Sequence, residues 1–269
     1  MVKVLVTGGT GVLGKAVSRI FHANQVDFVI GSRHQNTKNY NDGNRAFSAN
    51  AKWIHMDLLK KEGLNKSVNN GIDTILHLAS LPLKKIDGQL ADITLTKNLL
   101  HSIEKANVKH FVYISIVGID RIPFSYYKGK LECERLIKAS GIPYTILRAT
   151  QFHDLVDAFT SKLLTFPIAI VPKALKTQPI QVEAVASELN KITRGSPLNN
   201  VYEIGGKRVY SIGEIADSLL KVRREKKLLL NMPVIGQVMK TFAEGKNTCD
   251  EISSASNTWE EYLSNKYRR

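Results

Sequence analysis

The first residues of the chain constrain its fold most, because a buried strand there runs directly into a glycine-rich turn and a helix. This strand carries the apolar and largely β-branched residues Val2, Val4, Leu5 and Val6, as expected of a parallel strand covered on both faces. Gly8 allows a tight turn, Gly11 lets the backbone approach a phosphate, and Gly14 lets helix and strand pack closely. The N–H groups and dipole of the following helix favour an anion, so this segment predicts a site for the pyrophosphate of a dinucleotide.

Composition indicates a globular protein with a full core. The chain has 269 residues, of which 43% are hydrophobic. No apolar run approaches the roughly 20 residues that span a bilayer. The first strand begins at once, so we expect no signal peptide and a cytoplasmic location. Cys133 and Cys249 are too few for a disulfide framework, and we expect no metal site.

The charge balance is strongly basic. Lys and Arg number 38 against 24 Asp and Glu, giving a net charge of +14. The basic residues lie in short groups that are not interleaved with aromatic residues, so we expect solvated faces and no nucleic-acid partner. A basic surface would still attract an anionic small molecule. We also expect no membrane partner, because no segment is long enough to span a bilayer.

Strands and helices alternate along the first two thirds of the chain. A polar stretch at 35–50 is expected to be a surface connection, and residues 91–107 are expected to form a helix. The alternation predicts right-handed crossovers and a parallel, doubly wound sheet of the Rossmann type. After the first strand, the expected strands cover residues 26–30, 53–58, 73–80, 110–115 and 144–148.

The end of the second strand bears on the choice of cofactor. An acidic residue there would bind the 2′-hydroxyl of NAD, whereas this chain has Ser32 and Arg33. A hydroxyl and a guanidinium suit a 2′-phosphate, so we expect NADP(H) to be preferred, with NAD(H) possible. The alternative is that Arg33 stacks on the adenine or points into water.

Two further strand ends are expected near the nucleotide. Asp57 and Leu58 would frame the adenine, and the small residues Ala79 and Ser80 would permit close passage of the cofactor. His77 lies on the same apolar strand, where an isolated histidine is expected to be a satisfied core residue.

A candidate reaction centre follows the fifth strand. Tyr126 and Lys130 are four residues apart and share one helix face, whereas Tyr127 has no such lysine. A nearby ammonium favours a phenolate, and Ser115 would hydrogen-bond the same substrate oxygen. These three residues are the expected catalytic group, with Lys130 also able to hold the nicotinamide ribose. Alternatively, the tyrosine is partly exposed and the lysine solvated.

The chain resembles the short-chain dehydrogenase/reductase superfamily, in its atypical NAD(P)-binding branch of NmrA-like and epimerase-like proteins. The segments that carry this resemblance are 7–14, 57–58, 77–80, Ser115, Tyr126 with Lys130, and 143–152. Together with the strand-end residues considered above, the resemblance gives the expected cofactor contacts, which are Gly8, Thr10, Gly11, Val12, Leu13, Gly14, Ser32, Arg33, Asp57, Leu58, Ala79, Ser80, Lys130, Ala149 and Phe152. The loop between Ser115 and Tyr126 is shorter than in extended epimerases, and some members of this branch act as redox sensors or assembly factors.

The chain beyond the sixth strand is expected to contact substrate. Gln151 and His153 follow a carboxyl strand end and are the expected substrate-facing residues, although His153 is equally suited to the surface or a helix cap. Asp154 and Asp157 are three apart and are expected on a solvated helix face.

The expected domains are a dinucleotide-binding domain at 1–150, to which 177–205 returns, and a substrate flap and small, mostly helical cap at 151–176 and 206–269. Residues 155–176 are rich in apolar side chains and suit a flap over the substrate. Ser211 and Glu214 have the form of a capping box, and Trp259 is expected in the core.

We therefore expect an NADPH-dependent oxidoreductase that acts on a small carbonyl or quinone-like substrate. The alternative is a non-catalytic NADP(H)-binding protein that passes the redox state to a partner. A sugar-nucleotide epimerase or dehydratase fits less well, because of Arg33 and the modest length of the C-terminal part.

Overall fold

The computed structural model describes residues 2–34, 52–64 and 71–267. The chain forms two compact units. Unit 1 consists of Met1–Ser115, Lys128–Leu147 and Val185–Tyr202, and unit 2 of Ile116–Tyr127, Arg148–Ala184 and Glu203–Arg269. The expected connection at 35–50 falls outside the described residues.

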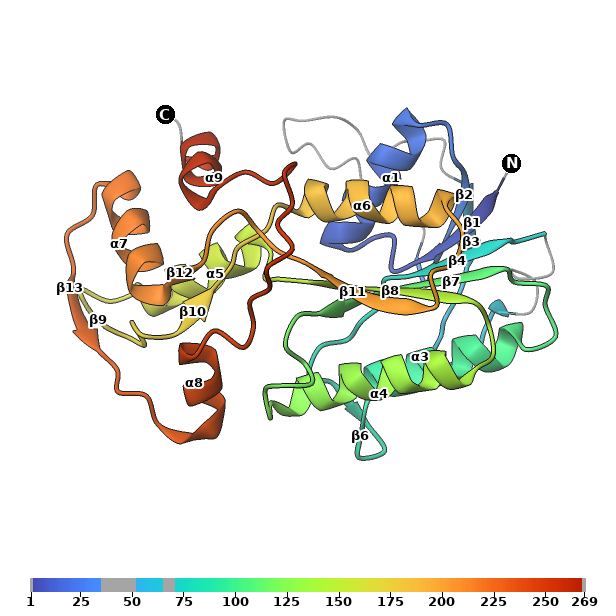
Figure 1. The fold of residues 1–269 in the computed structure, drawn as a ribbon, viewed down its shortest axis with the longest axis horizontal. Coiled ribbons are helices and arrows are strands. Elements are labelled where there is room, and N and C mark those ends of the chain that lie inside the picture. The colour runs from blue at the N-terminus through green and yellow to red at the C-terminus, as the bar shows by residue number, and fades with distance from the viewer. Residues whose placement is uncertain (1, 35–51, 65–70, 268–269) are drawn as a thin grey trace. The chain divides into compact units, whose positions relative to one another are not determined.

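A sheet that has seven strands among the described residues runs in the order β11-β8-β7-β4-β1-β2-β3 (Figure 1). The pairings β1–β2, β2–β3, β1–β4 and β4–β7 are parallel. Because the strand order reverses at β1, the expected doubly wound, Rossmann-type architecture is confirmed. The strands are β1 (Lys3–Thr7), β2 (Asp27–Ser32), β3 (Lys52–His55), β4 (Thr74–His77), β7 (His110–Ile116), β8 (Tyr144–Ala149) and β11 (Asn200–Ile204).

Helices cover both faces of this sheet (Figure 1). Helices α1 (Val12–Ala23) and α6 (Val182–Arg194) lie on one face, and α3 (Ala91–Ile103) and α4 (Ser125–Ala139) on the other. The strands carry apolar residues on both sides because both sides are covered, and Leu5 is completely buried. A short hairpin of β5 (Lys85–Ile86) and β6 (Gln89–Leu90) precedes α3.

Unit 2 has its own apolar core around Trp259, which is 1% exposed, as expected of a core residue. Ser211 and Glu214 form the expected capping box at the start of α7, and Thr258 and Glu261 form a second one at the start of α9. The elements of this unit are α5 (His153–Leu163), β9 (Ile168–Val171), β10 (Lys176–Thr177), β12 (Tyr210–Ser211), α7 (Ile212–Arg223), β13 (Leu228–Asn231), α8 (Gly236–Ala243) and α9 (Trp259–Lys266).

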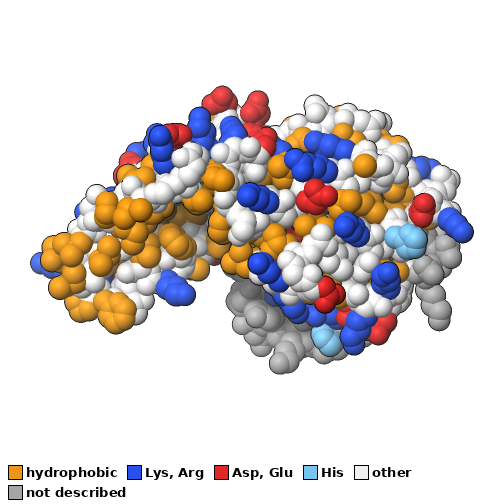
Figure 2. Space-filling view, turned by 90° about the horizontal axis from the view of Figure 1, so that it is seen from below, with side chains coloured by type: hydrophobic (Ala, Val, Ile, Leu, Met, Phe, Trp, Pro, Cys, Tyr) orange, Lys and Arg blue, Asp and Glu red, His pale blue; other side chains and the backbone are white. Residues whose placement is uncertain are grey.

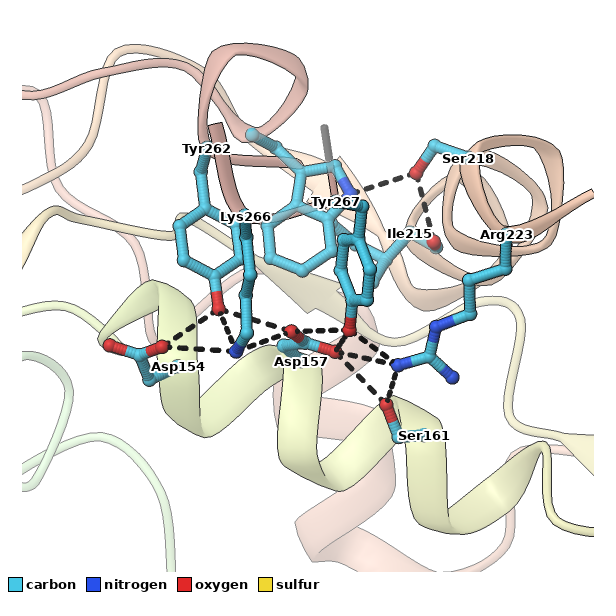
Figure 3. A network of polar contacts seen from close by, with 10 residues as sticks. Asp154, Asp157, Ser161, Ile215, Ser218, Arg223, Tyr262, Lys266 and Tyr267 are labelled. Carbon is cyan, nitrogen blue, oxygen red and sulfur yellow. Dashed lines mark hydrogen bonds and ion pairs between the residues drawn. The ribbon is translucent and has the colours of Figure 1, made fainter. Parts of the chain in front are cut away.

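The expectation of a solvated face for Asp157 is wrong, because the C-terminal helix covers it. Asp157 is 2% exposed, and its carboxylate accepts hydrogen bonds from several side chains of α7 and of the segment around α9 (Figure 3). Lys266 Nζ lies 2.8 Å from the carboxylate. Burial raises the pKa of Asp157, but the bonds from Lys266 and Ser161 outweigh that effect and hold the pKa below its ordinary value. Asp154, on the same face, keeps its contact with solvent.

We predict that Asp157→Asn lowers the free energy of unfolding by about 2–4 kcal/mol at neutral pH, because it removes a buried charge to which several side chains donate. Since the folded pKa is depressed, this contribution is present above the unfolded pKa of about 4 and is lost as the pH falls through the folded value. The difference in melting temperature between the wild type and the variant, measured by thermal unfolding, should therefore narrow below about pH 4.

Asp154→Asn is the matched control, because the Asp154 side chain is 56% exposed where it meets Lys266. We expect this variant to cost about 0–1 kcal/mol. Equal effects of the two substitutions would contradict the role assigned to Asp157. So would a difference in melting temperature between the wild type and Asp157→Asn that persists in acid.

Candidate functional site

The candidate site begins at one edge of the sheet, where three neighbouring parallel strands end together. Thr7 at the end of β1 is in register with His77 of β4, and His77 is in register with Tyr113 of β7. The glycine-rich turn, the segment after β4 and Ser115 therefore lie along the carboxyl edge, where ligands bind in open α/β sheets.

The glycine-rich turn is held by close contacts between backbones. Gly8 has a φ of +72°, and a Cβ atom there would lie 2.5 Å from the backbone nitrogen of Ala79. A Cβ atom at Gly14 would lie 2.4 Å from the carbonyl oxygen of Gly8. Both positions thus require glycine for the turn itself. Gly9 is a further constraint that the sequence analysis did not identify, since a Cβ there would lie 2.8 Å from the Ile30 side chain.

Gly11 differs from these glycines because space surrounds it. A Cβ atom there would meet only the Gly8 carbonyl oxygen, at 3.4 Å. Gly11 is the N-cap of α1, so the backbone N–H groups of the first helical turn lack intrahelical acceptors. Thr10 and Val12 are exposed beside it, while Leu13 is buried. This end of α1 offers an accessible group of donors and a positive dipole to an anion.

The residues expected at the adenosine end have different surroundings. Ser32 Oγ donates to the carbonyl oxygen of His34 at 2.8 Å and accepts from Trp53 Nε1 at 2.9 Å. The Ser32 hydroxyl proton is therefore already used, whereas Arg33 is exposed. Trp53 was not identified from the sequence, because it reaches Ser32 only through the pairing of β2 with β3.

Asp57 and Leu58 make structural contacts. Asp57 Oδ1 accepts the backbone N–H groups of Leu59 and Lys60, at 2.9 and 3.2 Å, and so closes a turn. Leu58 is buried in the core, and its carbonyl oxygen accepts from Asn98. Their expected contacts with adenine stay a prediction.

Beyond Ala79, the segment after β4 is tied to a buried carboxylate at the start of α3. Asp92 is 3% exposed, and it accepts from Ser80 Oγ at 2.6 Å and from the backbone N–H of Leu81 at 2.7 Å. Lys130 Nζ lies 3.5 Å from the same carboxylate. Asp92 was missed in the sequence, where it is a single acid at the start of an apolar helix.

Lys130 is buried and held on two sides. Its side chain is 4% exposed at the ion pair with Asp92. Its ammonium also donates to the Tyr113 hydroxyl at 3.1 Å and lies 4.9 Å from the centre of that ring. The solvated lysine that we considered as an alternative is therefore wrong for Lys130.

His77 is a satisfied core residue, as expected. It is 1% exposed, and burial, followed by the charge of Lys130, lowers its pKa to about 3. Thr96 Oγ1 donates to the Asp92 carbonyl oxygen, so it accepts from His77 Nε2, at 3.3 Å. His77 Nδ1 then accepts from Thr7 Oγ1 at 2.7 Å, which assigns a neutral ring with its proton on Nε2.

Ser115 is the exception at this edge. It is 3% exposed, and its hydroxyl has no hydrogen-bond partner in the part of the chain that the structure describes. A buried hydroxyl without a partner is costly, so it points to an acceptor or donor that a bound molecule supplies.

The two tyrosines at the start of α4 have different environments. Tyr127 is 6% exposed, and burial raises its pKa to about 12, which keeps its phenol neutral. Tyr126 is half-buried and precedes Lys130 by one helical turn. Its expected role in proton transfer stays a prediction.

The remaining residues that were expected to contact cofactor or substrate lie in unit 2. Ala149 ends β8, and Phe152 is the N-cap of α5. Gln151 Oε1 accepts from Thr177 Oγ1 at 2.9 Å and from Asn247 Nδ2 at 3.3 Å, so part of its amide is used within the unit.

His153 lies neither on the surface nor at a cap. It is 2% exposed and stacks on Tyr262 with ring centres 4.9 Å apart. Burial lowers its pKa to about 4. Its expected contact with substrate, like that of Gln151, stays a prediction.

Residues 2–34, 52–64 and 71–267 contain neither a candidate metal site nor a candidate membrane-spanning helix. No group of three or more His, Cys, Asp or Glu side chains in these ranges is arranged to hold a metal ion. No helix within them has the length and hydropathy needed to cross a membrane.

The residues along the carboxyl edge fit a dinucleotide. The start of α1 offers backbone donors beside the open position at Gly11, which suits a pyrophosphate. The unpartnered Ser115 hydroxyl lies along the same edge and suits a polar group of the cofactor or substrate.

Comparisons with known proteins agree with this fit. The model of a family described as NAD(P)H-binding matches residues 8–187. The photosystem II assembly factor Ycf39 of Trieres chinensis is 24% identical over 94% of this chain and 80% of its own length. Quinone oxidoreductase 2 of Escherichia coli is 21% identical over 81% of this chain and 73% of its own length.

Solved structures show the same fold. The crystal structure of the Escherichia coli quinone oxidoreductase complexed with NADPH has a TM-score of 0.77 and 17% identity, covering 98% of this chain and 100% of that one. A nucleoside-diphosphate-sugar epimerase from Staphylococcus aureus has a TM-score of 0.77 and 20% identity, covering 97% of this chain and 99% of that one.

We predict that Gly11→Ala weakens NADPH binding by at least about tenfold, because the added methyl group occupies the phosphate approach. The protein itself has room for this methyl group, so folding stability should fall by no more than about 1 kcal/mol. Calorimetric titration and thermal unfolding measure the two effects.

Gly14→Ala is the control for a purely structural glycine. Its methyl group would meet backbone atoms at 2.4 Å, so we expect a loss of more than about 2 kcal/mol in folding stability. An unchanged NADPH affinity in the Gly11→Ala protein would show that no phosphate approaches this turn.

Proposed function

The chain belongs to the NAD(P)H-binding family, and from this premise we propose that it is an NADPH-dependent oxidoreductase acting on a small carbonyl or quinone-like substrate. The observation that carries the proposal is the buried Ser115 hydroxyl, which has no partner among the described residues and lies at the same sheet edge as the glycine-rich turn. The similarity to quinone oxidoreductase 2 supports the substrate class.

In the proposed reaction, the protein's task is to bind the substrate oxygen and deliver a proton to it. A reduced nicotinamide, when bound, supplies a hydride. Ser115 donates a hydrogen bond to the substrate oxygen, and Tyr126 gives that oxygen its proton. The positive charge of Lys130, one helical turn further along α4, favours the phenolate that remains.

Burial supports the choice of Tyr126 as the proton donor. Tyr113 contacts the Lys130 ammonium, but it is 1% exposed and lies inside the core. Tyr127 is also buried, with its pKa raised to about 12. Tyr126 is the half-buried phenol of the three. Asp92 and Tyr113 act as positioning residues, because they fix the Lys130 ammonium.

Arg33 is the proposed basis of a preference for NADP(H). Its exposed guanidinium follows the end of β2, where a 2′-phosphate is expected. Ser32 contributes less than the sequence suggested, because its hydroxyl proton is bonded to the His34 carbonyl oxygen.

A second candidate function is a non-catalytic NADP(H)-binding protein. The observation that favours it is the buried ion pair of Lys130 with Asp92, which offsets the charge that would act on Tyr126. The relative named as an assembly factor belongs with this candidate. The two candidates differ in whether bound NADPH is oxidised.

We predict that Tyr126→Phe lowers kcat by about 10²–10⁴-fold, because general acid catalysis contributes that range. NADPH affinity should change by less than about threefold, since the hydroxyl is not needed to bind the cofactor. The measurement is the loss of NADPH absorbance with a panel of quinones, aldehydes and ketones, together with calorimetric titration.

Tyr127→Phe is the matched control, a neighbouring phenol without an assigned role in the reaction, and it should keep most of the activity. Full activity in the Tyr126→Phe protein would remove Tyr126 from the mechanism. Stoichiometric NADPH binding by the wild type without oxidation across the panel would replace the oxidoreductase with the non-catalytic candidate.

A further inference from the structure

A two-stranded ribbon in unit 2 has one face in the core and one apolar face exposed. Strands β9 and β13 pair in parallel, with Ile168 opposite Leu228 and Ile170 opposite Leu230. These four side chains are 58%, 59%, 55% and 45% exposed, respectively. Ala169, between them on β9, points instead into the core of unit 2. The alternation of a β-strand thus divides the apolar residues between core and solvent.

Two further exposed apolar side chains lie close to the ribbon in sequence. Phe166, just before β9, is 71% exposed, and Ile235, just before α8, is 70% exposed. Figure 2 shows hydrophobic side chains gathered over the part of the molecule formed by β9 and β13. Large contiguous apolar patches on a protein surface mark binding surfaces. We define the apolar face as Phe166, Ile168, Ile170, Leu228, Leu230 and Ile235.

The segments that carry the apolar face contain cationic residues and no acidic ones. Residues 158–182 include three lysines and no Asp or Glu, and residues 226–243 likewise include three lysines and no Asp or Glu. Lys162, Lys226 and Lys240 among them are exposed. Each of the two segments therefore has only positive formal charges, and Glu225, just before the second segment, pairs with Lys227 at 3.1 Å.

We propose that the apolar face binds the surface of a bilayer that contains anionic lipids. The outward side chains of the ribbon would enter the boundary between head groups and acyl chains, and the nearby lysines would meet lipid phosphates. A second copy of this chain is a poor occupant, because it would bring the same lysines and a net charge of +14 against them.

This mode of binding differs from the one that the sequence analysis considered. The expectation of no membrane partner rested on the lack of a spanning segment, whereas the apolar face would attach from one side of the bilayer. Residues 155–176 were expected to form a flap over the substrate, and a surface role for β9 gives another reason for their apolar composition.

Vesicle co-sedimentation of the full chain tests the proposal. Wild-type protein should sediment with vesicles of phosphatidylglycerol and phosphatidylcholine mixed about 1:1, and sediment much less with phosphatidylcholine alone. The double variant Ile170→Asn with Leu230→Asn should bind the mixed vesicles at least about tenfold more weakly. Both side chains are exposed, so the variant should fold and bind NADPH as the wild type does.

Leu198→Asn is the matched control, because Leu198 is 59% exposed but belongs to unit 1. It should leave vesicle binding unchanged. As a second readout, Phe166→Trp should shift its fluorescence to shorter wavelength when the mixed vesicles are added.

Three outcomes would overturn the proposal. If the wild-type protein does not sediment with the mixed vesicles, the apolar face is not a membrane-binding surface. Equal binding by the wild type and the double variant would reduce the interaction to general charge attraction. A dimer in solution that the double variant dissociates, without vesicle binding, would make a second copy the occupant.

Discussion

The contact between the backbone of the glycine-rich turn and the end of β4 is the constraint on which unit 1 depends. Gly8 approaches Ala79 so closely that a Cβ atom would lie 2.5 Å from its nitrogen, and Gly14 approaches the Gly8 carbonyl oxygen in the same way. These contacts fix where α1 begins. Because α1 begins at the carboxyl edge of the sheet, its unpaired N–H groups are directed at the position where ligands bind in this fold. The start of α1 is thus fixed at this edge because Gly8 and Gly14 have no Cβ atom.

Beneath this edge, buried polar groups are paired with one another and leave Ser115 as an exception. The hydrogen bonds form a connected series from the end of β1 to the ammonium on α4. Asp92 belongs to this series, and it binds both the segment after β4 and Lys130. Ser115 stands outside this network, since its hydroxyl is buried without a partner among the described residues. The edge therefore combines a network of paired buried groups with the Ser115 hydroxyl, which is unpaired in the part of the chain that the structure describes. The residues of the network are Ala79, Thr7, His77, Thr96, Asp92, Lys130 and Tyr113.

Local patterns in the sequence were sufficient for the fold, because strand alternation, the glycine spacing and the Ser211 capping box are each encoded within a few residues. Partners that the fold brings together from distant positions could not be predicted in this way. Asp92 meets Lys130 only after two helices pack on the same face of the sheet. Asp157 was expected in solvent because its donors on and after α9 come more than a hundred residues later. In each of these cases the sequence identified the residue or its helix, but the partner depended on tertiary packing.

The most direct measurement of the central claim is calorimetric titration of the wild-type chain with NADPH and, separately, with NADH. The account predicts one NADPH per chain, bound at least about tenfold more tightly than NADH, because Arg33 meets a 2′-phosphate that NADH lacks. Equal affinities would remove the role of Arg33 and leave the site at the turn intact. No heat with either nucleotide, confirmed by an absence of thermal stabilisation, would contradict the assignment of the glycine-rich turn as a dinucleotide site.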